Sequence, residues 1–139
     1  MVETLSDLDA VLSANLDFYR AFNDRNAKAM DALWARGAAV LCVHPGWTAL
    51  SGRDEVIKSW RAILANPDAP HVMCHDDRAF LYGDLAIVQC EEELDTGHLV
   101  ATNVFIREAG AWKMIHHQAS PIVARSHEER RRRPSPTRH

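Results

Sequence analysis

Two residues that can move protons, Glu92 and His117, lie in predicted strands of the C-terminal half of the chain. Side chains alternate along a strand, so Glu92 shares a face with Ala86, Val88 and Cys90. Its carboxylate is therefore expected among apolar groups. Loss of hydration raises a carboxyl pKa towards the range useful for proton transfer. Glu92 and His117 are our candidate acid/base pair.

The same residue types also have a purely structural explanation. Buried polar groups are normally hydrogen-bonded whether or not they catalyse, so Glu92 could instead pair with Asn103 or His117 in a satisfied network.

Strict alternation along the last strand puts His117 on one face and Trp112 and Met114 on the other. His116 then falls on the outer face, where packing or a dimer interface is expected, and Trp112 is expected in the core.

A second group of candidates lies in the stretch VHPGWTALSGRDEVIKSW (43–60). His44 precedes a Pro-Gly turn, where a histidine either contacts a ligand or bonds locally to the turn. Trp60 belongs to the apolar stripe of a predicted helix and is expected to seal the core, with a place in a cavity wall as the alternative. Trp47 follows the turn and lies on no periodic stripe, so the mouth of a cavity suits it as well as a core position.

The histidines near residue 73 do not predict a metal site. His71 and His75 would share one face of a strand but stand about 13 Å apart, too far to bind one ion. The sequence has no phosphate-binding loop, nucleophile elbow or dinucleotide fingerprint. No metal and no other cofactor is expected.

The elements that must position these residues fall into two groups, helices first and strands afterwards. Helices are expected over 4–24, 26–37 and 51–65, capped by Thr4, Asn26 and Ser51, and strands over 38–44, 48–50, 71–81, 85–94, 98–108 and 111–119. Segregated helices and antiparallel strands indicate an α+β fold. The strands must bury one face, and the helices are the available cover.

The stretches HPGWTALSGRDEVIKSW (44–60) and FIREAGAWKMIHHQAS (105–120) resemble the SnoaL-like members of the nuclear transport factor 2-like superfamily. The resemblance covers residues 4–122 and extends to the ketosteroid isomerases and the association domain of calcium/calmodulin-dependent kinase II. It implies a curved antiparallel sheet wrapped around the long N-terminal helix, like an open cone. The hollow of the cone would be the ligand site, and the outer sheet face would form a homodimer.

The resemblance also implies which residues face the hollow. Alignment with the kinase association domain places Glu92, Asn103 and Ala119 at positions where that relative has arginines and binds anions, with His117 on the same face. The missing arginines imply an uncharged ligand. Tyr19 would take the role of the tyrosine in the steroid isomerases. The implied function is binding of a small neutral organic molecule, with proton-transfer chemistry of the isomerase, cyclase or dehydratase type; the alternative is a non-catalytic dimeric association or ligand-sensing module.

Composition supports a single domain over 1–122 followed by a basic tail, 123–139, expected to be disordered. Residues 125–139 hold six arginines and two glutamates and so carry a charge of +4. Residues 1–124 therefore carry −7, which gives the net charge of −3. An acidic body argues against nucleic acid as a partner. No apolar run approaches the ~18 residues of a membrane helix, and no signal peptide is evident. Three cysteines, an odd number, favour reduced thiols and a cytoplasmic location.

Overall fold

The computed structural model describes residues 3–123 and has the α+β fold expected, with three helices and a six-stranded sheet in that part of the chain. The elements are α1 (Glu3–Asn23), α2 (Ala27–Leu33), β1 (Leu41–Val43), β2 (Leu50–Ser51), α3 (Arg53–Ala65), β3 (Met73–Tyr82), β4 (Leu85–Leu94), β5 (Gly97–Glu108) and β6 (Ala111–Ile122). The strand order is β2-β1-β6-β5-β4-β3, and all neighbours are antiparallel except β1 and β6. The predicted tail, apart from Val123, lies outside the described residues.

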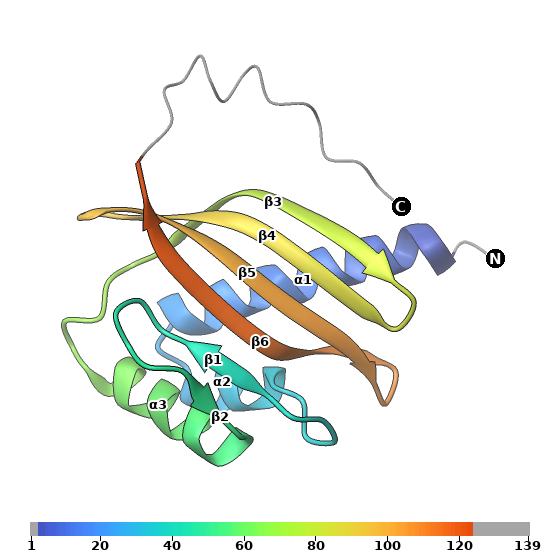
Figure 1. Ribbon diagram of the computed structural model, residues 1–139, viewed down its shortest axis with the longest axis horizontal. Helices are drawn as coiled ribbons and strands as arrows, with labels where there is room; N and C mark the ends of the chain where they lie inside the picture. Colours follow the sequence, from blue (N-terminus) through green and yellow to red (C-terminus); the bar gives the residue numbers. More distant parts are fainter. Residues whose placement is uncertain (1–2, 124–139) are drawn as a thin grey trace.

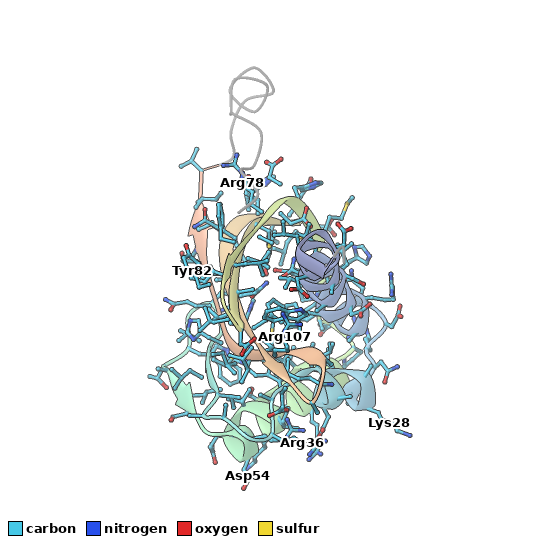
Figure 2. The ribbon with its side chains drawn as sticks, turned by 90° about the vertical axis from the view of Figure 1, so that its right-hand side faces the viewer. Lys28, Arg36, Asp54, Arg78, Tyr82 and Arg107 are labelled. Carbon is cyan, nitrogen blue, oxygen red and sulfur yellow. The ribbon has the colours of Figure 1, made fainter. Side chains whose placement is uncertain are left out.

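The long sheet bends around α1. Figure 1 shows α1 running along one face of β3 to β6, with α2 and α3 at the end where β1 and β2 extend the sheet. Figure 2, turned by 90°, shows the strands arching beside this helix. The helix presents Leu8, Val11, Phe18 and Tyr19 on one face, and all four side chains are buried. No helix of residues 3–123 has both the length and the apolar content to cross a bilayer.

Two helix boundaries differ from the sequence prediction. Asn26 caps α2 as expected, accepting a hydrogen bond from the Ala29 amide at 3.0 Å, but the helix stops at Leu33 rather than near 37. Trp34 leaves the helix because it forms a β-bridge with Met114 of β6. Ser51 does not cap α3: it ends β2, and Gly52, with a φ of 94°, occupies the capping position without a side-chain bond.

Strand alternation is correct for β4 and β5 but fails in β6. Val104 pairs with His116 whereas Phe105 pairs with Met114, so Ile115 is an extra residue that forms a β-bulge. The bulge reverses the alternation within β6. Met114 therefore faces the core together with His117, and so does Trp112, instead of lying on the opposite face.

Candidate functional site

A cavity of about 530 Å³ lies within the curve of the sheet, beside the C-terminal half of α1. Its walls come from α1, α3, the loop between β1 and β2, the turn between β4 and β5, and the ends of β4 and β6. Cavities of this size accept drug-sized ligands, and an apolar lining with a few polar groups is typical of small-molecule sites. Six of the seven predicted site residues line it: Tyr19, His44, Trp47, Trp60, Glu92 and His117.

Asn103 is the exception. It is fully buried and does not line the cavity, although it shares the inner sheet face with Glu92 and His117. It pairs directly opposite His117 in the β5–β6 ladder, so its amide lies beside the imidazole. Asn103 therefore supports the cavity wall rather than touching its contents.

Tyr19 and Glu92 form a short polar contact at the cavity. The Tyr19 hydroxyl donates to Glu92 Oε2 at 2.6 Å and lies 3.2 Å from Cys90 Sγ. Burial raises the pKa of the Glu92 carboxyl, and the hydrogen bond from Tyr19 partly opposes that rise. Burial, with the neighbouring Cys90 and Glu92, raises the pKa of Tyr19 well above its usual value. The result is a carboxyl that can hold a proton more readily than one in water.

His117 belongs to the same network through Asn103. Its Nδ1 lies 2.6 Å from Asn103 Oδ1, and Asn103 Nδ2 donates to Asn15 Oδ1 at 2.8 Å and to the Tyr19 hydroxyl at 3.2 Å. Complete burial, with smaller contributions from His44 and His116, lowers the pKa of His117 to about 3. The imidazole is therefore neutral at neutral pH.

His44 bonds to helix α3 and not locally to its turn. It lines the cavity, and its Nε2 lies 2.9 Å from Ser59 Oγ. The Ser59 hydroxyl proton goes to the Val56 carbonyl at 2.6 Å, so His44 must be the donor of its bond to Ser59. Burial lowers the pKa of His44 to about 4.

The two tryptophans beside His44 occupy different depths. Their rings approach the imidazole edge-on, Trp47 at 4.7 Å and Trp60 at 4.6 Å between centroids. Trp60 is 2% exposed and closes the inner wall, whereas Trp47 is 47% exposed and stands where the cavity meets solvent. The cavity thus has a solvent-exposed tryptophan at its rim and a buried tryptophan in its inner wall.

Comparison with known proteins identifies the fold family. A model of the SnoaL-like domain matches residues 11–124. The chain belongs to this SnoaL-like family. A solved structure of a candidate dehydratase of the NTF2-like family from Streptomyces avermitilis is 36% identical, with a TM-score of 0.78 over 86% of this chain and 98% of that one. The predicted family and its cone fold are confirmed.

Two further relatives broaden the comparison with this SnoaL-like chain. A candidate calcium/calmodulin-dependent protein kinase type II association domain from Thiobacillus denitrificans is 32% identical, with a TM-score of 0.71 over 78% of this chain and 92% of that one. The F-box protein SKIP8 of Arabidopsis thaliana is 34% identical over 116 residues, which are 82% of this chain. The chain spans about half the length of that plant protein.

Sequence reasoning missed two polar residues of the SnoaL-like site, Asn15 and Ser59. Asn15 lies on the buried stripe of α1, four residues before Tyr19, and is fully buried. A polar residue on an apolar stripe is the signal that could have revealed it, because such a group needs a buried partner. Ser59 is similarly placed beside Trp60 in α3 and signals a partner in the same way.

Asn23, the last residue of α1, and Arg25, just after it, fix the loop that leads into the cavity wall. Asn23 makes a two-point contact with the backbone of Val72, its Nδ2 donating at 2.8 Å and its Oδ1 accepting at 2.9 Å. Arg25 donates to the carbonyls of Asn66, Pro67 and Ala69. Because Val72 lines the cavity, these contacts position one side of it.

Groups of three or more histidine, cysteine or acidic side chains with a metal-binding arrangement are absent from residues 3–123. His75, one of the histidines considered above, instead lies 2.6 Å from Glu93 Oε1.

Proposed function

We propose that this SnoaL-like chain binds a small, uncharged organic molecule in the cavity and catalyses proton transfer on it, with Glu92 and His117 as the acid/base pair. The observation that carries the proposal is that both side chains line one cavity in apolar surroundings. Burial raises the pKa of Glu92 and lowers that of His117. One group can thus carry a proton while the other is free to accept one.

This pairing suits several reactions of one class. In an isomerisation, one group removes a proton while the other delivers a proton elsewhere on the substrate. In a dehydration, one group removes a proton from carbon and the other protonates the departing hydroxyl. The likeness to the candidate dehydratase favours reactions of this kind. Anionic substrates fit less well, because no lysine or arginine lines the cavity in the described part of the chain.

Proton exchange tests the proposal before the natural substrate is known. Compounds that copurify with the protein are identified by mass spectrometry, and neutral alcohols and ketones are screened by thermal shift. Each bound compound is then incubated with the protein in D₂O, and deuterium uptake is followed by NMR. Glu92→Gln should slow the exchange by roughly 10²- to 10⁴-fold while retaining binding, because the amide keeps the shape but cannot transfer the proton.

Glu55→Gln is the matched control, since it removes a carboxylate from an exposed position of α3. It should leave the exchange rate unchanged. A ligand that binds the wild-type protein without any exchange, or an exchange rate unaffected by Glu92→Gln, would rule out the acid/base role of Glu92.

The second candidate function is a non-catalytic association or ligand-sensing module. The likeness to the candidate kinase II association domain favours it.

We propose, for either function, a cytoplasmic homodimer that pairs through the outer sheet face, and a domain that ends near residue 122. On β5 this face carries Val100, Val104 and Ile106, all partly exposed. Light scattering of the wild-type protein and of Val104→Glu tests the interface: the dimer should become a monomer.

A further inference from the structure

Five polar side chains beside the cavity form one buried chain of hydrogen bonds: Asn15, Tyr19, Glu92, Asn103 and His117. Each is 5% exposed or less. Solvent therefore competes little for their donors and acceptors. Their protons can be assigned by counting the donors and acceptors that each group has.

The amide of Asn103 can satisfy its neighbours in one orientation. Its nitrogen faces two oxygens, those of Asn15 and Tyr19, and its oxygen faces Nδ1 of His117. Turning this amide over would place two carbonyl oxygens 2.8 Å apart unless Asn15 turned as well. It would also draw the Tyr19 proton away from Glu92, the acceptor at 2.6 Å. The described orientation avoids both conflicts.

This orientation fixes the tautomer of His117. Asn103 Oδ1 can only accept, so Nδ1 of His117 must carry the ring proton. The neutral ring then has its lone pair on Nε2. Asn103 occupies the Nδ1 edge of the imidazole and does not line the cavity, whereas His117 does, so we take the Nε2 edge as the one turned towards the ligand. Phe18 and Trp60, with centroids 4.9 and 5.8 Å from the imidazole, hold the ring in place.

His44 and His98 also line the cavity. Nε2 of His44 is the donor to Ser59, and Cys42 Sγ lies 3.7 Å from that nitrogen and 3.9 Å from Nδ1. Nδ1 of His98 is buried and has no hydrogen-bond partner among the described residues. His117 is the cavity histidine whose hydrogen bond to Asn103 assigns the lone pair to Nε2.

We propose that His117 presents an acceptor nitrogen to the cavity, that Asn103 is the positioning residue that sets it, and that the ligand is an uncharged compound with a hydrogen-bond donor, as in an alcohol or a phenol. This inference rests on the proposed function, because it assigns the ligand class for the same cavity. A ketone or an ether would bury Nε2 without a donor, and an unpaired buried acceptor is costly. The site therefore selects against compounds that lack a hydroxyl or similar donor.

The tautomer is measured first, and without a ligand. Long-range ¹H–¹⁵N NMR of the wild-type protein at pH 7 distinguishes a proton on Nδ1 of His117 from one on Nε2. We expect Nδ1–H in the wild-type protein. Asn103→Leu removes the acceptor and should release the ring into a mixture of tautomers, whereas Asn103→Asp keeps an acceptor and should keep Nδ1–H. A proton on Nε2 in the wild-type protein would overturn the proposal.

A matched pair of probes tests the ligand class. 2-Naphthol and 2-methoxynaphthalene differ by a methyl group on the oxygen, and both are small enough for a cavity of about 530 Å³. Titration calorimetry should give roughly 10- to 100-fold tighter binding of the naphthol to the wild-type protein. Asn103→Leu should reduce this preference and Asn103→Asp should preserve it. Equal affinities for the two probes, or no binding of 2-naphthol, would refute the assigned ligand class.

The two proposals can fail separately. If no ligand undergoes proton exchange, the catalytic function is refuted, while the tautomer and the preference for the naphthol can still be observed. If the tautomer is Nε2–H, the ligand class is refuted even where exchange is catalysed. The wild-type measurements decide the matter should either Asn103 variant fail to fold.

Discussion

Buried His117 should make the protein sensitive to mild acid. Its pKa is lowered to about 3 in the folded state, whereas an unfolded histidine titrates near its ordinary value of about 6.5. Between these values the unfolded chain binds more protons than the folded one, so stability falls as the pH falls. For each such histidine, a fall of one pH unit well inside this range lowers the free energy of unfolding by about 1.4 kcal/mol.

Between pH 7 and pH 5, about 1.5 pH units lie below the pKa of about 6.5 of an unfolded histidine. His117 alone should therefore lower the free energy of unfolding by about 2 kcal/mol over this change. His44, with a pKa lowered to about 4, adds a similar loss. Glu92 acts in the opposite direction, because its raised pKa makes the folded state the better proton binder above its unfolded pKa. The contribution of His117 is therefore best isolated by a variant.

Between pH 7 and pH 5 the free energy of unfolding of His117→Phe should fall by about 2 kcal/mol less than that of the wild-type protein. At pH 7 the variant should be less stable than the wild-type protein by about 1–3 kcal/mol, because the Asn103 oxygen loses its partner. Urea unfolding followed by tryptophan fluorescence at both pH values measures this difference. His71→Phe, at an exposed position, controls for the removal of a histidine. If wild type and His117→Phe lose stability equally, within about 0.5 kcal/mol, the buried neutral histidine is refuted.

Three further changes probe the walls of the site. Trp47→Ala should weaken 2-naphthol binding in calorimetry by about 10-fold, yet cost about 1 kcal/mol or less in urea unfolding, because the ring is half exposed; unchanged affinity would exclude it from the mouth. Arg25→Ala frees three carbonyls and should speed amide exchange in residues 66–72 but not in β5. Ser59→Ala removes the acceptor of the His44 proton and should cost about 1–3 kcal/mol in urea unfolding; no loss would contradict that bond.

The sequence predicted the order of elements because that order depends on short-range periodicity. For the cavity lining, the alternation of β4 placed Glu92 inside. Tyr19 was instead implied by the resemblance to the steroid isomerases, and His44 and Trp47 were predicted from the turn beside them. The depth of Asn103 was not predictable in this way. Alternation says which face a side chain is on, but not whether it reaches the cavity or is buried against its neighbours, as Asn103 is.

The errors arose where tertiary contacts override local patterns. Trp34 leaves α2 to pair with β6, a bond between segments 80 residues apart that no local signal reports. The bulge at Ile115 likewise depends on pairing with β5. Asn15 was the avoidable omission, because a polar residue on a buried helical stripe predicts a partner from the sequence alone.

The bulge in β6 also joins two parts of that strand that have different roles. The half before Ile115 supplies Trp112 and Met114 to the core, and the half after it supplies His117 to the cavity. One extra residue brings two unrelated demands onto the same side of a single strand. A lineage that lost it would have to give up either the packing of Trp112 and Met114 in the core or the orientation of His117, so length variation should be accepted at the turns of this domain long before it is accepted here.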